Sequence, residues 1–436
     1  MRLLLRGARV VDPSQPIDEK IDILVENGKI VRVAKNIYKS RTQNDAEADA
    51  PSTLKILDLR GKIVVPGLID MHTHLREPGF EYRETIQTGC EAATAGGFTA
   101  LACMPNTNPV NDNHSVTESI IRKARECDLC HVYPVAAISR GSEGAMLAEF
   151  WDLKDAGAVA FSDDGKPVMN AALMRRALEY AASLDMPVIS HCEDLHLTAG
   201  GVMNEGFVAT ELGLQGIPSV AEEVMAARDI LIAEFTGAAV HIAHVSTAGS
   251  VRLIREAKTR GICVTAETAP HYFTLTDEAV REFDVNAKVN PPLRGIEDVT
   301  AVKEGLRDGT IDVIASDHAP HATTDKDVEF DDAAFGMVGL ETSLGLSLKL
   351  VADGILTLDQ LIMKMSTAPA RILGIPGGTL KTGSTADMTV IDPAVAWTVD
   401  RERFRSKGRN TPFHGWDMRG KAVMTIVGGE IKYRQV

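Results

Sequence analysis

Two histidines and an arginine alternate along the stretch DMHTHLREPG, residues 70–79. If this stretch ends a strand, side chains two residues apart leave the same face, so His72 and His74 can converge on one metal ion. Arg76 follows on that face, and its planar guanidinium can bind a carboxylate through two parallel hydrogen bonds. We expect Glu77 to orient the loop that follows. The stretch therefore predicts a metal site with an anion-binding side chain beside it.

Further metal-binding side chains occur where four other apolar runs end, namely Asp163 and Asp164, His191, His244, and Asp317. Together with the first two histidines they are enough for two metal ions, and such donors favour Zn²⁺, although Mn²⁺ or Co²⁺ could use the same set. Two metals need a bridging carboxylate and a shared water, whose pKa falls toward ~7 on binding. Neighbouring strand residues face opposite ways, so spacing alone leaves Asp163 and Asp164 both open as the bridge.

These side chains need a scaffold that gathers strand ends, and one pattern occurs eight times between residues 68 and 320. A short apolar run ends in polar residues and is followed by a stretch with helical periodicity, such as SVAEEVMAARDILIAEF. Runs that are apolar on both faces suit parallel strands covered by helices. The pattern predicts an α/β fold, a (β/α)8 TIM-type barrel, in which working residues lie at the carboxyl ends of the strands.

The two ends of the chain follow a different pattern. Residues 1–65 contain strand candidates such as LLLRGARVV and IDILVENGKIVRVA with turn signals between them, and the tail repeats this in ADMTVIDP and AVMTIVGGEIKYR. We expect residues 1–65 and 378–436 to form one small composite β-sandwich and residues 66–377 to form the catalytic barrel. The polar, aperiodic residues 36–53 are expected to be a surface loop.

Composition restricts the class of protein. The chain is 44% apolar and 24% charged, as in ordinary globular proteins, and its net charge of −14 disfavours nucleic acid or an anionic membrane surface as a partner. It contains no apolar run near ~18 residues and no signal-peptide pattern, so we expect a cytoplasmic protein. The six cysteines have no framework spacing and are expected to be reduced; we interpret the C-x-x-C-H stretch at 127–131 as the packing of a helix end.

The motifs together resemble the dihydroorotases, a family of cyclic amidohydrolases. The stretches that carry the resemblance are DMHTHLREPG, MPNTNP, FSDDG, SHCED, HVS, KVNPPLR, SDHAPH and AFG, with VVPGLID before them and GTLKTGSTAD after them. They span nearly the whole chain. The resemblance is to the type whose bridging metal ligand is an aspartate in place of a carboxylated lysine, so Lys166 is expected to be a loop residue.

The resemblance implies a role for each matching residue. Two Zn²⁺ ions per chain are expected, with His72, His74 and Asp317 at the first, His191 and His244 at the second, and Asp164 as the bridge. Asp317 would also be the catalytic acid and base. The substrate contacts would be Arg76, Asn106 and His321 at a carboxylate, Asn290 with the backbone of Phe335 and Gly336 at a pyrimidine ring, and His74. The polar residues 322–332 could act as a lid.

The expected reaction is the reversible hydrolysis of L-dihydroorotate to N-carbamoyl-L-aspartate in de novo pyrimidine (UMP) biosynthesis. One alternative is another cyclic amidase, a hydantoinase or allantoinase, although these usually carry the bridging lysine and do not need a carboxylate clamp. The other is a non-catalytic partner of aspartate transcarbamoylase, although such proteins typically lose metal ligands. The sequence leaves open a homo-oligomer and a complex of the active enzyme with aspartate transcarbamoylase.

Overall fold

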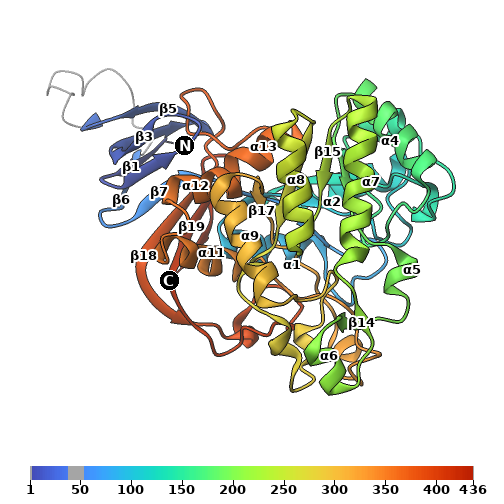
Figure 1. The fold of residues 1–436 in the computed structure, drawn as a ribbon. Coiled ribbons are helices and arrows are strands. Elements are labelled where there is room, and N and C mark those ends of the chain that lie inside the picture. Colours follow the sequence, from blue (N-terminus) through green and yellow to red (C-terminus); the bar gives the residue numbers. More distant parts are fainter. Residues whose placement is uncertain (1, 38–53, 436) are drawn as a thin grey trace, which may run out of the picture.

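Eight parallel strands form a barrel at the centre of the molecule, in a computed structural model that describes residues 2–37 and 54–435 (Figure 1). In chain order they are β8 (Leu68–Thr73), β9 (Phe98–Cys103), β10 (His131–Ala136), β11 (Ala160–Phe161), β12 (Val188–Ser190), β15 (Val240–Ile242), β16 (Val264–Thr268) and β17 (Val313–Ile314). The first and last strands meet through a parallel bridge between Thr73 and His318 and through the His74 N–H, which donates to the His318 carbonyl at 2.9 Å. The predicted TIM-type barrel is confirmed.

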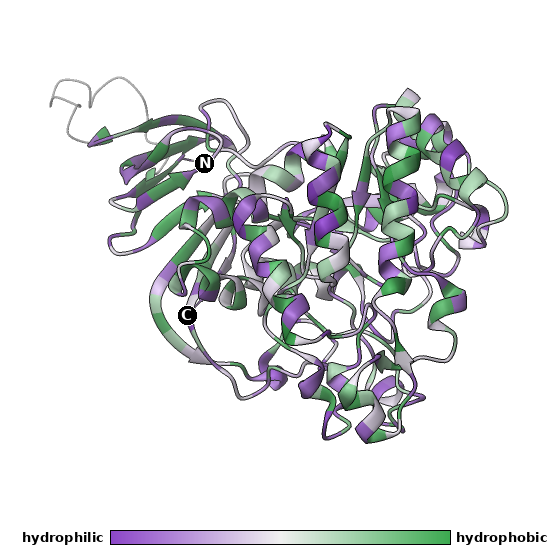
Figure 2. Cartoon of the chain, viewed as in Figure 1, coloured by the Kyte–Doolittle hydropathy of each residue, from purple (hydrophilic) through white to green (hydrophobic). Residues whose placement is uncertain are grey.

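Helices cover the outside of the barrel. They are α1 (Ile86–Gly96), α2 (His114–Cys127), α3 (Phe150–Asp155), α4 (Ala171–Ser183), α7 (Val220–Thr236), α8 (Ala248–Thr259), α9 (Ile296–Asp308) and α11 (Ser343–Ala352). Side chains at helical spacing face the strands; α4, for example, buries Leu173, Met174, Ala177, Leu178 and Ala181. Figure 2 shows hydrophobic and hydrophilic stripes on these helices, as expected for helices with one face on a core.

Polar side chains that begin the helices satisfy the first free backbone N–H groups. Thr85, Asn113, Asn170 and Thr247 each accept a hydrogen bond from the first turn of the helix that follows. Glu77 adds a further acceptor, since its Oε2 receives the N–H of Ile86 at 2.9 Å. The expectation that Glu77 orients the loop after the metal-binding stretch is therefore confirmed.

Both chain ends contribute strands to the same sheet. The six-stranded sheet joins β2 (Arg9–Asp12), β3 (Ile17–Lys20) and β7 (Ile63–Pro66) to β18 (Met388–Thr398), β19 (Asp417–Val427) and β20 (Glu430–Arg434). The four-stranded sheet consists of β1 (Arg2–Arg6), β4 (Asp22–Glu26), β5 (Lys29–Ala34) and β6 (Leu54–Asp58). One buried apolar cluster joins the sheets, and Figure 1 shows the blue and red strands side by side.

This arrangement gives the composite sandwich that the terminal patterns predict. Its boundaries at residues 66 and 377 stay a prediction. Residues 38–53, most of the expected surface loop, lie outside the described residues. Between β17 and β18 the chain forms α12 (Leu358–Ile362), which packs against β2 and α11, and α13 (Ala368–Leu373), which packs against β8. None of the described helices is long and apolar enough to cross a membrane.

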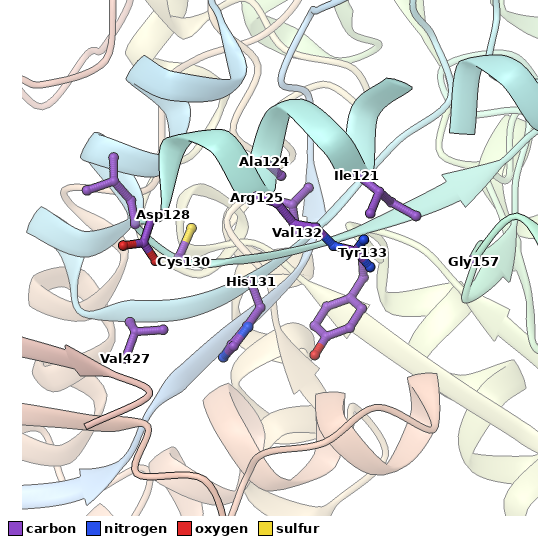
Figure 3. A pocket seen from close by; sticks show the side chains of 11 residues that line it. Ile121, Ala124, Arg125, Asp128, Cys130, His131, Val132, Tyr133, Gly157 and Val427 are labelled. Atoms are coloured by element: carbon purple, nitrogen blue, oxygen red, sulfur yellow. The ribbon is translucent and has the colours of Figure 1, made fainter. Parts of the chain in front are cut away.

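The C-x-x-C-H stretch connects α2 to β10, at the end of the barrel opposite to the predicted metal ligands. Cys127 is the last residue of α2, and Cys130 is buried just before the strand. The His131 Nε2 lies 3.1 Å from Asp387 Oδ2, which ties the barrel to the tail. With Tyr133 the stretch lines a cavity of about 410 Å³, and Figure 3 shows His131 and Tyr133 on the same side of β10. The arrangement agrees with helix-end packing.

Candidate metal centre and substrate site

The predicted metal ligands meet at the carboxyl ends of five barrel strands. His72 and His74 come from the end of β8, and Asp164, His191, His244 and Asp317 follow β11, β12, β15 and β17. The Oδ2 of Asp164 lies 3.4 Å from His72 Nε2 and 3.6 Å from His74 Nε2. Its Oδ1 lies 3.4 Å from His191 Nδ1 and 3.3 Å from His244 Nε2. The two oxygens of one carboxylate thus face two different pairs of histidines.

Asp317 belongs with the first pair, since its Oδ1 lies 3.3 Å from His74 Nε2 and 3.6 Å from His72 Nε2. Asp163 faces away from the cluster, because its oxygens accept hydrogen bonds from the backbone N–H and the hydroxyl of Ser139. Lys166 is exposed. The geometry therefore favours Asp164 over Asp163 as the shared carboxylate.

The donor atoms fit metal ions. The His72 Nε2 is buried and has no hydrogen-bond partner among the described residues, although most buried polar side-chain atoms do have one. The His191 Nδ1 and His244 Nε2 lie only 2.8 Å apart. Donor atoms of His72, His74 and Asp164 all lie within 4.8 Å of one another. The same holds for a second group, Asp164, His191 and His244. Imidazole and carboxylate donors suit a divalent metal such as zinc.

Three further side chains fix the orientation of these histidines. Glu267 Oε1 lies 2.5 Å from His72 Nδ1. Asn106 Oδ1 lies 3.0 Å from His74 Nδ1, and Glu193 Oε2 lies 2.8 Å from His191 Nε2. When these oxygens accept a hydrogen bond from one nitrogen of a neutral imidazole, the other nitrogen directs its lone pair toward the centre, an arrangement usual for metal-binding histidines.

Sequence reasoning missed Glu267 and Glu193. The only available signals were acidic residues inside ICVTAETAPH and SHCED, which say nothing about a partner on another strand. Asn106 was expected at the substrate carboxylate, and its Oδ1 is directed at His74. Glu193 Oε2 also accepts a hydrogen bond from Asn290 Nδ2 at 3.0 Å, so the second histidine pair is linked to a predicted substrate contact.

Histidine neighbours keep the central carboxylates ionised. Burial opposes the charged form of Asp164, but the charge of His72 and hydrogen bonds from His191 and His244 lower its pKa well below the usual range. Burial acts the same way on Asp317, and a hydrogen bond from His74 with the charge of His72 lowers its pKa. Both side chains are therefore carboxylates at neutral pH, the form that binds metal.

A cavity of about 230 Å³ opens above the ligands. Its lining includes every predicted substrate contact and every predicted metal ligand except His72, which lies beneath: His74, Arg76, Asn106, Asp164, His191, His244, Asn290, Asp317, His321, Phe335 and Gly336. A volume of this order suits a ligand of few atoms. The structure thus brings the predicted site residues around one small space.

Arg76 is the buried cation of this cavity. Its Nε donates to the Pro320 carbonyl at 3.1 Å, and its Nη2 lies 3.4 Å from His321 Nε2. Burial lowers the pKa of Arg76 to about 10, so the side chain stays protonated at neutral pH. Burial, with Arg76 nearby, lowers the pKa of His321 to about 2, and its neutral ring donates from Nε2 to the Phe335 carbonyl at 2.8 Å.

Backbone conformations at the site are unusual. Arg76, His244 and Asp317 have φ angles of 62°, 33° and 48°, a region that non-glycine residues seldom adopt. Such conformations cost roughly 1–3 kcal/mol each and cluster at functional sites, where the surrounding structure holds them. The left-handed turns aim these three side chains into the cavity mouth in directions that an alternating strand pattern does not predict.

Hydrogen bonds hold the segment 322–332, the predicted lid, against neighbouring loops. It contains the short helix α10 (Thr323–Lys326), and Lys326 Nζ donates to the carbonyls of Val285, Lys288 and Ala334 at 2.8, 3.2 and 2.6 Å. Arg83 binds both oxygens of Asp325. The segment that leads from His321 to Phe335 is thus held by hydrogen bonds from Lys326 and Arg83.

The chain is similar along its whole length to proteins named dihydroorotase. Residues 61–250 match the family described as Dihydro-orotase-like, and residues 215–433 match the Amidohydrolase family. The dihydroorotase of Syntrophus aciditrophicus is 63% identical over 435 residues, covering 100% of both chains. That of Pelotomaculum thermopropionicum is 61% identical over 432 residues, covering 99% of this chain and 98% of that one.

Solved structures share the fold at lower identity. The L-hydantoinase (dihydropyrimidinase) of Arthrobacter aurescens superposes with a TM-score of 0.86 at 26% identity, covering 99% of this chain and 96% of the other. The full-length identity to dihydroorotases far exceeds the identity to this hydantoinase. With its metal-binding group and its buried arginine in one cavity at the carboxyl ends of the barrel strands, the chain belongs to the dihydroorotase family of the amidohydrolases.

Proposed function

We propose that the chain catalyses the reversible hydrolysis of L-dihydroorotate to N-carbamoyl-L-aspartate. The observation that carries this proposal is a buried guanidinium, Arg76, in the same small cavity as two groups of metal-binding side chains. A cyclic amide that bears an exocyclic carboxylate needs both features, and dihydroorotate is such a molecule. Relatives named dihydroorotase at up to 63% identity support the same reaction.

Zinc is the metal we propose, with two ions per chain. His72, His74 and Asp317 would hold one, His191 and His244 the other, and Asp164 both. When bound, the metals supply a Lewis acid for the amide carbonyl and a water molecule that ionises near neutral pH. The donor set of four imidazoles and two carboxylates supports this choice.

The substrate carboxylate would lie against the Arg76 fork, with Asn106 and His321 beside it. His321 donates its Nε2–H to the Phe335 carbonyl. Its Nε2 lies 3.4 Å from Arg76 Nη2, so a carboxylate held by Arg76 can compete for this donor. Asn290 and the backbone of Phe335 and Gly336 would contact the ring. These contacts orient the ring amide over Asp164 and Asp317.

Asp317 would move the proton. As a carboxylate it accepts a proton at a side-chain oxygen from the attacking water, and it then donates that proton to the ring nitrogen as the amide bond breaks. In the synthetic direction the carboxylate takes the proton back from the carbamoyl nitrogen. The lowered pKa of Asp317 favours its carboxylate, the proton-accepting form, at the start of hydrolysis.

The test compares substrates that differ in the carboxylate. We expect the purified, zinc-loaded chain, without aspartate transcarbamoylase, to hydrolyse L-dihydroorotate and to leave hydantoin and dihydrouracil nearly untouched. The variant Arg76→Ala should raise KM for L-dihydroorotate more than it lowers kcat, because the clamp binds ground and transition states alike. Preferred turnover of hydantoin or dihydrouracil would favour a hydantoinase-type activity instead. An unchanged KM would remove Arg76 from the substrate site.

A further inference from the structure

A second cavity, larger than the metal-binding one, lies at the tail of the chain. It has a volume of about 790 Å³ and is lined by residues of β18, β19 and β20, by the segment that joins β18 to β19, and by Glu341 just before α11. Four cations line it, Arg403, Arg405, Lys421 and Arg434, together with the rings of Trp397 and Tyr433. We call it the tail cleft. None of these residues takes part in the proposed reaction.

Within the described ranges of the chain, the arginines of the tail cleft have no ion-pair partner, while Lys421 lies over the Trp397 ring and near the Glu341 carboxyl. Among the described residues, none of the four makes an ion pair or donates a side-chain hydrogen bond, although the chain as a whole carries a net charge of −14. The acidic side chains of the cleft are Glu341 and Asp400, and both are engaged with backbone. Glu341 Oε1 accepts from the N–H groups of Arg405 and Ser406 at 2.7 and 3.2 Å. Asp400 Oδ1 accepts from the Glu402 N–H at 3.1 Å.

Unpaired cations gathered in one concave site attract a polyanion, and arginine side chains fit phosphate oxygens in particular. A scattered basic surface would give weak, salt-sensitive attraction only, whereas a cleft of this volume can enclose a molecule of about nucleotide size. The cleft therefore has the charge and the dimensions of a site for a phosphorylated small molecule.

The aromatic rings add a second recognition feature. Trp397 is half-buried, and its indole Nε1 donates to the Gly420 carbonyl at 3.0 Å, which fixes the ring plane. Lys421 Nζ lies 4.4 Å from the centre of the Trp397 ring. Tyr433 is also half-buried in the same wall. A fixed aromatic face beside phosphate-binding cations suits a ligand that has both a planar ring and phosphates.

We propose that the tail cleft binds a nucleotide, with its phosphates on Arg403, Arg405, Lys421 and Arg434 and its base against Trp397 or Tyr433. This site is separate from the proposed reaction and does not depend on it.

The segment that lines the cleft also holds the substrate site. Lys407 N–H donates to Glu84 at 3.1 Å, and Ser406 bonds the same carboxylate. Asn410 Nδ2 donates to the carbonyls of Ala319 and Gly336 at 3.0 and 3.1 Å, and its Oδ1 accepts from the His321 N–H at 3.1 Å. A nucleotide that immobilises Arg403 and Arg405 would therefore also restrain the segment that supports His321 and Gly336.

Binding is tested with the full, zinc-loaded chain and a fluorescent ATP that carries an N-methylanthraniloyl group, followed by anisotropy. We expect saturable binding, competition by unlabelled ATP, and much weaker competition by tripolyphosphate or adenosine alone. The double variant Arg403→Ala/Arg434→Ala should raise Kd at least tenfold. The control variant Arg419→Ala removes a cation of β19 that lies outside the cleft and should change Kd less than twofold.

Several results would overturn the proposal. They are no saturable binding at millimolar nucleotide, equal Kd values in the double variant and the control, tripolyphosphate competing as well as ATP, or an Asp-rich peptide binding more tightly than ATP. Amide hydrogen exchange gives a second readout, because residues 403–410 should exchange more slowly with ATP in the wild type and not in the double variant. Both readouts are independent of turnover, so failure here is distinguishable from failure of the proposed reaction.

Discussion

Asp317 is the side chain on which the proposed proton transfer depends. Replacement by asparagine keeps its size but removes the basic oxygen that lies 3.3 Å from His74 Nε2. We expect Asp317→Asn to lower kcat by at least ~10²-fold, with KM for L-dihydroorotate changed only a few-fold. Metal content, measured by atomic absorption, must stay close to that of the wild type, so that the lower kcat can be assigned to lost proton transfer and not to lost metal. Near-normal turnover would remove Asp317 as the acid and base.

Glu267 would act on a bound metal through His72. Its Oε1 lies 2.5 Å from His72 Nδ1, while its Oε2 lies 3.3 Å from His241 Nε2, and all three side chains are buried. We expect Glu267→Gln to weaken zinc binding by roughly 10–100-fold, the usual cost of losing the partner of a ligand histidine. The measurement is competition with a chromophoric chelator. Glu278→Gln, at an exposed carboxylate, is the control; equal affinities in the two variants would contradict the role.

The residue scale also shows where sequence reasoning succeeds. The histidines could be predicted because strand alternation and barrel geometry together place strand ends in one place. Asp163 and Asp164 could not be separated by spacing, and what separates them is a contact with Ser139, 24 positions away in the sequence. Glu267 is 195 positions from His72, so their pairing depends on strand order and rotamers that no local pattern encodes.

At the scale of elements, the segment that contains α10 connects His321 to Phe335, and both of these residues line the cavity. Lys326 donates to three carbonyls there. The carbonyls of Val285 and Lys288 also accept from the N–H groups of Lys288 and Gly336, so Lys326→Met leaves the Ala334 carbonyl without its donor, at about 1–3 kcal/mol. We expect faster amide exchange over residues 322–334 and a several-fold higher KM, with metal content unchanged. Lys349→Met, at an exposed lysine of α11, is the control. Unchanged exchange in Lys326→Met would show that other contacts hold the segment.

The eight barrel strands were predictable because each is apolar on both faces and ends in polar residues. Their lengths were not, since β11 and β17 have only two residues each in regular pairing. The small sheet of β13 (Met203–Asn204) and β14 (Gly216–Ile217) was not predicted, because two-residue strands leave no periodic pattern. It depends instead on Arg294, which donates to Asn204 Oδ1 and to the Ile217 carbonyl at 3.1 and 2.9 Å.

At the scale of the whole molecule, the two ends of the barrel differ in what they carry: one has the candidate metal site and the other contacts the composite sandwich. The carboxyl ends of the strands carry the buried imidazoles and carboxylates of the candidate metal site. The opposite end carries the contact of His131 with Asp387, and there the barrel joins the composite sandwich. Hydrogen bonds between Thr73, His74 and His318 close the barrel at the carboxyl end, and we expect bound metal to add to the stability of that end.

Metal removal should consequently loosen the whole barrel. The predicted ligands come from the ends of β8, β11, β12, β15 and β17, so bound metal would link the ends of five of the eight strands. A ligand at about 1,000 times its Kd stabilises the folded state by about 4 kcal/mol. We expect chelator treatment at neutral pH to lower Tm by several degrees, and zinc to restore it. His191→Ala should show a smaller difference between treated and untreated protein, whereas His114→Ala, at a surface position, should behave as the wild type does. Equal Tm values with and without metal in the wild type would mean that the strand ends are held by protein contacts alone.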